Sequence, residues 1–347
     1  QMAHAKSGQW WETEPQRALA NNSVAYKSKP EMGTFMREWL ALYDSKFGER
    51  GMFNREAADK QVARNGRRET GHMWGTNPCS EIILRGYQFC NLSEVVVRET
   101  DTLDSLKRKV RIATILGTLQ STLTDFKYLR KVWKDNTEEE RLLGVSLTGI
   151  MDHHVLSKNV DSKRWLEEMR QEAVDTNKNF ANMLGIPQSA AITCVKPSGT
   201  VSQLVDAASG IHARHNDYYI RTVRGDNKDP LTQFLIEEGV HNERDMMKPD
   251  SVTVFSFAMK SPDGAVTRTQ MTAVQQLELW KTYAIHYQQA PYQDIEPDDY
   301  YDWQQSYSHV KIDWNKLTEF EKEDNTSGSR ELACTAGVCE VVDLNAA

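Results

Sequence analysis

A nine-residue stretch, Thr76-Asn77-Pro78-Cys79-Ser80-Glu81-Ile82-Ile83-Leu84, constrains the fold of this chain more than any other segment. It places an amide, a thiol and a carboxylate at alternate positions: Asn77, Cys79 and Glu81. In an extended backbone, residues two apart point to the same side. A loop or strand tip here is therefore expected to aim all three groups into one cavity, with Pro78 restricting the backbone.

A second thiol, Cys90, follows shortly, and Cys194, Cys334 and Cys339 complete a set of five cysteines. Five scattered cysteines are too few for a disulfide scaffold, and in a reducing compartment they are more often catalytic, metal-binding or simply buried. Zinc is not expected, because the chain has no Cys-x-x-Cys pair and the step from Cys334 to Cys339 has no matching second half. Cys194, in an apolar run, is most simply a small buried residue.

Composition limits the classes of function that remain. The net charge of -7 over 347 residues argues against a general nucleic-acid binder. A hydrophobic content of 39% with 26% charged residues is typical of a soluble globular protein. The sequence contains no apolar run of about 18 residues and no signal-peptide pattern, so a membrane span is not expected and a cytoplasmic location is.

Apolar residues recur at helical spacing in four stretches, and short β-branched runs predict strands. We expect helices over 33–47, 103–123, 161–184 and 272–286, and strands over 94–97, 190–195, 218–224 and 252–258. The triplet Glu138, Glu139 and Glu140 is expected to open a further helix, where acidic residues match the positive end of the helix dipole. Residues 59–76 are polar and predict a loop. The alternation of strands and helices indicates the α/β class.

The turn after the strand at 190–195 has the composition of a phosphate-binding site. Pro197, Ser198, Gly199, Thr200 and Ser202 lie between a buried strand and an expected helix start. Backbone N–H groups and the positive end of a helix favour anions, and hydroxyls add donors. A capped turn without any ligand has a similar composition, so this pattern alone leaves both interpretations open.

The C-terminal segment, Glu319 to Ala347, is charged and contains Ser327-Gly328-Ser329 ahead of the last two cysteines. Small residues separate Cys334 from Cys339, so the two thiols could close a small disulfide ring or exchange with another disulfide. We therefore expect 1–318 to be a catalytic domain and 319–347 to be a flexible tail with a redox cysteine pair.

These segments, in this order, resemble the ribonucleotide reductases, and most closely their adenosylcobalamin-dependent (class II) branch. Asn77-Pro78-Cys79-x-Glu81 with Cys90-Asn91-Leu92 is similar to the finger loop of that family, and Pro197-Ser198-Gly199-Thr200 is similar to its substrate-phosphate loop. The resemblance implies radical reduction of ribonucleotides to deoxyribonucleotides for DNA replication. Cys79 would carry a thiyl radical, Glu81 would act as general base, Asn77 would hold the substrate hydroxyls and Cys90 would supply reducing equivalents.

The resemblance also implies a ten-stranded α/β barrel around a central finger loop, of which this chain forms the later part. It implies adenosylcobalamin as cofactor, a ribonucleoside di- or triphosphate as substrate, and a thioredoxin-like or small dithiol reductant acting through Cys334 and Cys339. The family has an N-terminal portion containing the thiol partner of the cysteine that matches Cys90. We expect this portion to be missing here or to come from a second chain. Cys194 is an alternative partner.

Three alternatives remain open from the sequence. The chain could be the large subunit of an oxygen-dependent (class I) reductase that needs a separate radical-generating subunit. It could be a non-catalytic nucleotide-binding subunit. It could also be a cysteine-dependent acyl-transfer enzyme that uses Cys79 with a histidine.

Overall fold

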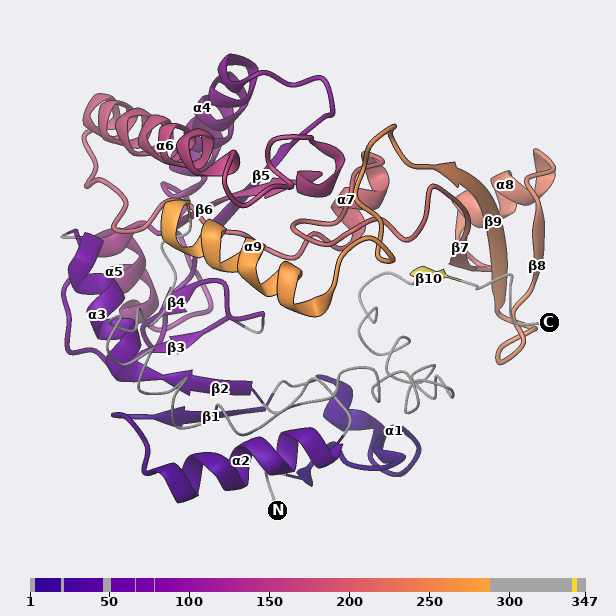
Figure 1. Ribbon diagram of the computed structural model, residues 1–347, viewed down its shortest axis with the longest axis horizontal. Helices are drawn as coiled ribbons and strands as arrows, with labels where there is room; N and C mark the ends of the chain where they lie inside the picture. Colours follow the sequence, from indigo (N-terminus) through magenta and orange to yellow (C-terminus); the bar gives the residue numbers. More distant parts are fainter. Residues whose placement is uncertain are drawn as a thin grey trace. The chain divides into compact units, whose positions relative to one another are not determined.

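The computed structural model describes residues 4–19, 22–45, 51–65, 67–77, 79–287 and 339–341. The chain divides into two compact units (Figure 1). The first unit comprises residues 1–24, 30–52 and 292–338, and the second comprises residues 25–29, 53–291 and 339–347. The expected boundary between a catalytic domain and a tail, at 318/319, lies outside the described residues.

The first unit is mainly helical where it is described. It contains the short helix α1 (Trp10–Thr13), the 3-10 helix η2 (Pro15–Leu19) and the longer helix α2 (Met32–Ser45). The helix expected over 33–47 is thus confirmed as α2. Strands β1 (Ser23–Tyr26) and β2 (Gly51–Asn54), of which residues 23–24 and 51–52 belong to this unit, pair in a two-stranded sheet.

Two parallel strands lie in the core of the second unit. β5 (Asn91–Val96) and β6 (Leu143–Thr148) pair in register from Asn91 opposite Leu143 to Val96 opposite Thr148. All six residues of β6 are buried, as expected for a parallel strand covered on both faces. The extended segment 191–194 runs along the other edge of β6, where the Cys194 amide donates to the Val145 carbonyl at 3.2 Å.

Three helices cover these strands. α4 (Leu103–Gln120) packs on β5, β6 and α6 (Ser162–Leu184), and α9 (Ala273–His286) packs on α6. Buried apolar side chains of these elements form one core; they include Val95, Leu106, Val110, Leu147, Leu166, Met169, Leu279 and Tyr283. These helices confirm the expected ones, and Thr102 and Thr272 cap the N-termini of α4 and α9 through their hydroxyls.

The expected apolar stripe of α4 is only partly core. Leu106, Val110 and Ala113 are buried, but Leu116 is 59% exposed and Leu123, beyond the end of the helix, is 71% exposed. Helical spacing identifies which residues share a face, but it does not say how far along the helix a neighbouring element extends. The prediction of core was therefore wrong for Leu116 and Leu123.

Two expectations before and after the finger stretch were wrong. Residues 59–65, expected in a loop, belong to helix α3 (Arg55–Asn65), whose Ala58 and Val62 pack with Trp74 and Ile83. Tertiary burial of those two small apolar side chains stabilises a helix that is otherwise mostly polar.

The acidic triplet ends a helix instead of opening one. Helix α5 (Lys131–Glu140) closes at Glu140, and Arg141 follows in the left-handed conformation with φ 42°. Acidic residues at a helix C-terminus oppose the dipole. Here two arginines from an earlier segment offset this cost, because Arg68 and Arg85 form ion pairs with Glu140.

An antiparallel sheet in the order β10-β7-β9-β8 forms another part of the second unit. Its strands are β7 (Tyr218–Asp226), β8 (Asn242–Arg244), β9 (Val252–Lys260) and β10 (Cys339–Val341). β7 and β9 confirm the strands expected over 218–224 and 252–258. Helix α8 (Pro230–Glu237) follows β7. Earlier in the chain, the remaining described elements are the 3-10 helix η3 (Ile150–Asp152), helix α7 (Thr200–Leu204) and a small hairpin of β3 (Gly75–Thr76) and β4 (Ile83–Leu84).

The strands of the described residues form sheets of two, four, two and two strands. This confirms the α/β class, whereas a ten-stranded barrel is not seen in the part of the chain that the structure describes.

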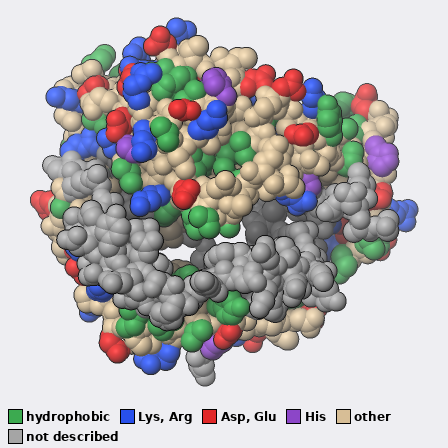
Figure 2. Space-filling view, in the orientation of Figure 1, with side chains coloured by type: hydrophobic (Ala, Val, Ile, Leu, Met, Phe, Trp, Pro, Cys, Tyr) green, Lys and Arg blue, Asp and Glu red, His purple; other side chains and the backbone are tan. Residues whose placement is uncertain are grey.

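On the face shown in Figure 2, basic and acidic side chains are interspersed. Among the described helices, none combines the length and the apolar character needed to span a membrane.

Candidate functional site

The finger stretch forms the tip of a small hairpin. β3 (Gly75–Thr76) pairs antiparallel with β4 (Ile83–Leu84), so that Thr76 lies opposite Ile83. Asn77 closes the loop between them: its Oδ1 accepts from the Ile82 amide at 3.0 Å, and its own amide donates to the Ile82 carbonyl at 3.3 Å. Pro78, expected to restrict this loop, lies outside the described residues.

The three groups of the finger do not share one environment. Asn77 is engaged within the loop, Cys79 is exposed and Glu81 is only 4% exposed. The alternation rule holds only in extended chain, and Ser80, between Cys79 and Glu81, has φ 64°. The left-handed residue turns the chain, so the thiol faces solvent while the carboxylate is buried.

The partner of Glu81 comes from the other side of the site. The Lys196 ammonium donates to Glu81 Oε1 at 2.9 Å, although the two residues are far apart in sequence. Lys196 follows the buried segment 191–194, and its backbone amide donates to Ser146 Oγ on β6 at 2.9 Å. A buried carboxylate is expected to be paired, and the parallel packing of 191–194 against β6 places the lysine where it meets the finger.

The thiols around this pair stay protonated near neutral pH. Partial burial, together with the negative charge of Glu81, raises the pKa of Cys79. The same two causes raise the pKa of Cys90 to about 11, with Lys196 acting in the opposite direction. Burial also raises the pKa of Cys194 strongly. A nucleophilic cysteine needs a lowered pKa, so this site disfavours the acyl-transfer alternative and favours S–H groups that donate hydrogen.

Cys194 lies close to the other groups of the site. It is 2% exposed, and the charges of Glu81 and Cys90 contribute to the raised pKa of its thiol. A Cβ on Gly144 would lie 2.5 Å from Leu92 and 3.2 Å from the Cys194 sulfur. The absent side chain at Gly144 is therefore what lets β5, the finger and the 191–194 segment pack closely at this point.

The expected phosphate turn is held by its own serines. Ser198 Oγ donates to Glu94 Oε2 of β5 at 2.9 Å, and Ser202 Oγ donates to the carbonyl oxygens of Ser198 and Gly199 at 2.7 and 2.8 Å. Both serines are buried, whereas Pro197 and Gly199 are exposed. Burial raises the pKa of Glu94 despite these contacts and the charge of Lys196. The serine hydroxyls thus shape the turn, and its exposed backbone at Gly199 remains open to solvent.

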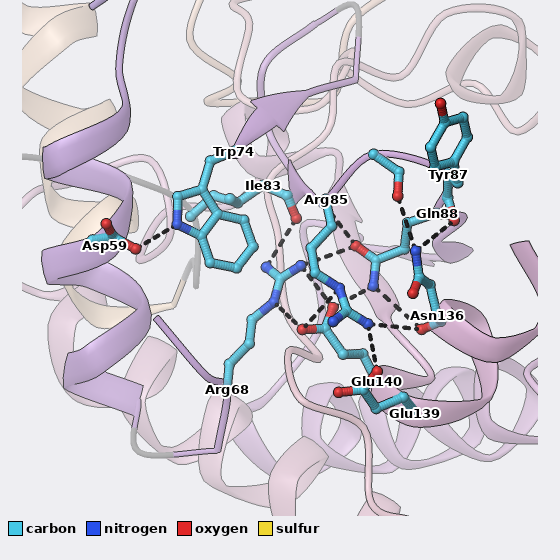
Figure 3. Close-up of polar contacts among 11 residues, drawn as sticks. Asp59, Arg68, Trp74, Ile83, Arg85, Tyr87, Gln88, Asn136, Glu139 and Glu140 are labelled. Carbon is cyan, nitrogen blue, oxygen red and sulfur yellow. Dashed lines mark hydrogen bonds and ion pairs between the residues drawn. The ribbon is translucent and has the colours of Figure 1, made fainter. Parts of the chain in front are cut away.

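A second cluster anchors the finger hairpin, and we call it the anchor cluster: Asp59, Arg68, Trp74, Arg85, Gln88 and Glu140 (Figure 3). Arg68 binds Glu140 through two bonds of 2.9 and 2.8 Å and also donates to the Ile83 carbonyl at 2.9 Å. Its guanidinium lies 4.6 Å from the centre of the Trp74 ring, and the indole N–H donates to Asp59 at 2.6 Å. Gln88 donates to the same Glu140 carboxylate. The hairpin is therefore tied to both α3 and α5.

The sequence predictions located most of this site but not its cation. Asn77, Cys79, Glu81 and Cys90 come from one segment, and the structure brings the 196–202 turn to them. The sequence patterns predicted no role for Lys196, although it directly precedes the turn expected to bind an anion. A basic residue next to an anion-binding turn was the sequence signal that could have identified it. Of the expected tail pair, Cys334 lies outside the described residues, and the backbone of Cys339 pairs with that of Val223 in β7.

Comparison with known proteins identifies relatives for part of the chain. No family model matches it. It is 30% identical to the adenosylcobalamin-dependent ribonucleoside-triphosphate reductase of Euglena gracilis over 208 residues, which is 59% of this chain and 28% of that protein. It is 30% identical to the enzyme of the same name from Lacticaseibacillus paracasei over 271 residues, 69% of this chain and 35% of that protein.

A solved structure of a B12-dependent (class II) ribonucleotide reductase superposes with a TM-score of 0.65 at 21% identity, covering 87% of this chain and 47% of that one. At this identity the superposition establishes likeness of fold. The chain spans about a third of the length of the curated relatives it matches. In sequence and in fold, the chain is therefore similar, over part of their length, to the adenosylcobalamin-dependent ribonucleotide reductases, as its motifs predicted.

Proposed function

We propose that this chain carries the reaction centre of an adenosylcobalamin-dependent ribonucleotide reductase, acting on a ribonucleoside triphosphate. The observation that supports it most is the finger loop itself: an exposed, protonated Cys79 thiol next to a buried Glu81. The triphosphate is favoured because the relatives are named ribonucleoside-triphosphate reductases. A cytoplasmic location fits chemistry that depends on reduced thiols.

Cys79 would remove the 3′-hydrogen of the ribose as a thiyl radical and return a hydrogen atom at the end. Hydrogen-atom transfer needs the thiol form, so the raised pKa of Cys79 suits this role. The exposed thiol is also accessible to a bound group, which fits an external radical source. When bound, adenosylcobalamin would supply the initiating radical.

Glu81 would accept the proton of the 3′-hydroxyl, which lets the 2′-hydroxyl leave as water. Asn77 would hold the substrate hydroxyls through its side-chain amide. Cys90 and a second thiol would supply two electrons and two protons, ending as a disulfide. Cys194 is one candidate for that second thiol, and a cysteine outside this chain is the other.

The turn around Ser198, Gly199 and Thr200 would receive the 5′ phosphates. Cys334 and Cys339 would reduce the spent disulfide by exchange and pass the oxidation to a thioredoxin-like protein or a small dithiol. We further propose that β5, β6 and the segment 191–194 are neighbouring strands of a ten-stranded barrel, completed by a segment or chain beyond the described residues.

The direct test is anaerobic conversion of ribonucleoside triphosphates to deoxyribonucleotides with adenosylcobalamin and a small dithiol. Wild-type chain should form product, and Cys79→Ala should form none. Product that persists in Cys79→Ala would refute the mechanism. Nucleotide binding without turnover in the wild type would instead favour a binding subunit or a large subunit that needs a radical-generating partner.

The tail has its own test. Cys334→Ser should stop multiple turnover with a protein reductant such as thioredoxin but should spare turnover with a small dithiol that enters the site directly. Equal loss with both reductants would remove the shuttle role of the tail cysteines.

A further inference from the structure

The turn at 196–202 offers an anion its backbone more than its serine side chains. Ser198 donates its hydroxyl to Glu94, and Ser202 donates to carbonyl oxygens of the turn itself. Gly199, which has no side chain, is exposed. Backbone N–H groups bind an anion well only when their directions are already fixed, because they cannot rotate toward it as a side chain can. Phosphate affinity should therefore depend on the groups that hold this backbone in place.

The segment 206–210 contacts the turn directly. Ser209 Oγ donates to the Ser198 carbonyl oxygen. Gly210 has φ 53°, and a Cβ on it would lie 2.8 Å from the Lys196 carbonyl oxygen. Only glycine allows both this conformation and this close approach. The segment therefore supports the turn at its first and third residues.

A buried carboxylate fixes this segment to the core. Asp152 ends the 3-10 helix η3, shortly after the buried strand β6, and its side chain is 3% exposed. Its Oδ2 accepts from the Ala208 amide at 2.8 Å. Thr148, the last residue of β6, accepts at Oγ1 from the Gly210 amide at 2.9 Å and donates to the Ala208 carbonyl at 2.9 Å. Hydrogen bonds from the end of β6 and from η3 thus hold the middle of the segment.

Arg214 binds the same carboxylate and the start of the segment. Its guanidinium donates to both oxygens of Asp152, at 2.8 and 2.9 Å, and its side chain is 4% exposed. It also donates to the Asp206 carboxylate at 2.9 Å and to the Asp206 carbonyl at 3.2 Å. A guanidinium that binds both oxygens of a carboxylate fixes the geometry of the pair. The pair of Asp152 and Arg214 therefore holds the segment at Asp206 and Ala208.

We propose that Asp152 and Arg214 are positioning residues for phosphate binding: their buried pair holds the segment 206–210, and this segment holds the backbone of the turn in the geometry that receives the 5′ phosphates. Both residues act through the turn and do not contact the nucleotide. The inference rests on the proposed function, since it takes the turn to be the phosphate site.

The first experiment separates phosphate recognition from binding of the nucleoside. Calorimetry on the full chain would measure the affinities of cytidine triphosphate, inorganic triphosphate and cytidine. Asp152→Asn keeps the shape of the side chain but removes its charge and faces an NH₂ group toward hydrogen-bond donors. It should weaken both phosphate ligands by about tenfold and leave cytidine unchanged. Equal weakening of cytidine and its triphosphate, or no weakening, would overturn the proposal.

Asp245→Asn is the matched control. Asp245 follows β8 in the antiparallel sheet, is also buried, and accepts from the Arg224 guanidinium at 2.6 Å. Like Asp152, it accepts from backbone amides as well, here those of Met247 and Lys248. Asp245→Asn should leave all three affinities unchanged. If it weakened triphosphate binding as much as Asp152→Asn does, a general loosening of the fold would explain both effects and the proposal would fail.

Ser209→Ala tests the link between segment and turn while the buried pair stays intact. It removes the hydrogen bond from a half-buried hydroxyl to the Ser198 carbonyl oxygen. Triphosphate binding should weaken by about threefold, and cytidine binding should not change. This variant decides the question where Asp152→Asn does not fold. An unchanged triphosphate affinity in Ser209→Ala would then overturn the proposal.

Turnover distinguishes this inference from the function on which it rests. In an active enzyme, Asp152→Asn should raise KM for the triphosphate by about tenfold and leave kcat unchanged, because the finger groups are untouched. An inactive wild type that prefers triphosphate to cytidine, and loses this preference in Asp152→Asn, would support the positioning role and count against the reductase proposal. An active wild type whose preference survives in Asp152→Asn would overturn the positioning role alone. A wild type without the preference would overturn the phosphate turn and the positioning role together.

Discussion

Two buried glutamates in the same unit are held in different ways. Glu140 ends α5 with its side chain 6% exposed, and Arg68, Arg85 and Gln88 all contact its carboxylate. Glu81 in the finger is 3% exposed, and Lys196 forms its ion pair. The Arg68 side chain is 4% exposed, against 32% for Lys196. One carboxylate is bound by rigid, buried arginine donors, and the other is paired with a lysine that is partly exposed.

The difference separates a carboxylate that anchors the hairpin from one that is proposed to act as a base. A planar guanidinium that binds both oxygens of a carboxylate fixes its position. Such a carboxylate cannot accept a proton without breaking several bonds. The anchor cluster therefore holds the finger hairpin, whereas the carboxylate of the finger is paired with a flexible lysine.

The largest expected effect is on activity at Glu81. Glu81→Gln keeps the shape of the side chain but removes the base, so turnover should fall by about 10²- to 10⁴-fold. Stability should change by less than about 1 kcal/mol, because Lys196 reaches solvent and is not left as a buried charge. Anaerobic product assays and urea unfolding measure the two effects. If the loss of activity were matched by an equal loss of folded protein, Glu81 would be a structural carboxylate like Glu140, and the difference between the two glutamates would not hold.

Glu140→Gln should show the opposite pattern. It leaves the Arg68 guanidinium buried without a carboxylate, and breaking such a pair costs about 3–5 kcal/mol of the free energy of unfolding. Urea unfolding measures this loss. Replacing both partners, as in Arg68→Met with Glu140→Leu, should recover part of it, since the buried guanidinium of Arg68 is removed together with its carboxylate and Arg85 keeps its ion pair with Glu139. A Glu140→Gln variant as stable as the wild type would show that the anchor cluster does not hold the hairpin.

The reactivity of Cys90 tests the charges of the finger site. Its pKa of about 11 reflects burial and Glu81, with Lys196 opposing them. Glu81→Gln should lower the pKa of Cys90 and speed its alkylation by iodoacetamide at pH 8, and Lys196→Met should raise the pKa and slow the reaction. Each change should be several-fold, up to about tenfold per pKa unit. Peptide mass spectrometry after timed quenching follows Cys90 alone, and changes of the same sign would contradict this electrostatic account.

The smallest effect is expected at the rim of the anchor cluster. Glu139 pairs with Arg85 at 2.9 Å, but its side chain is 56% exposed. Glu139→Gln should therefore cost less than about 1 kcal/mol of the free energy of unfolding. Urea unfolding beside Glu140→Gln gives a comparison of neighbouring residues on one helix. If Glu139→Gln and Glu140→Gln lowered the free energy of unfolding equally, burial would not determine how much these ion pairs stabilise the protein.

Part of this site could be predicted from local sequence. The finger residues and Cys90 lie within one short segment, and the turn at 196–202 has its own composition. Even there, the shared orientation of Asn77, Cys79 and Glu81 was wrong, because a single left-handed residue, Ser80, interrupts the extended backbone. Periodicity assumes regular geometry, and a loop tip departs from it.

The acidic triplet shows the same limit for secondary structure. Glu138 to Glu140 favour a helix N-terminus by charge alone. The chain places them at a C-terminus, since β6 must begin at Leu143 to enter the core and Arg68 and Arg85 compensate the charge. Those arginines are more than 50 residues away, which no local rule includes.

By itself, the sequence determined the α/β class and most helices and strands, and it supplied the residues of the proposed chemistry, because these depend on patterns within about 20 residues. The tertiary structure decided which groups meet: Lys196 with Glu81, Ser198 with Glu94, and Arg68 with Glu140. Parallel strands bring distant segments side by side, and a buried charge is stable only beside a partner. The pairing of charges is therefore a property of the folded chain.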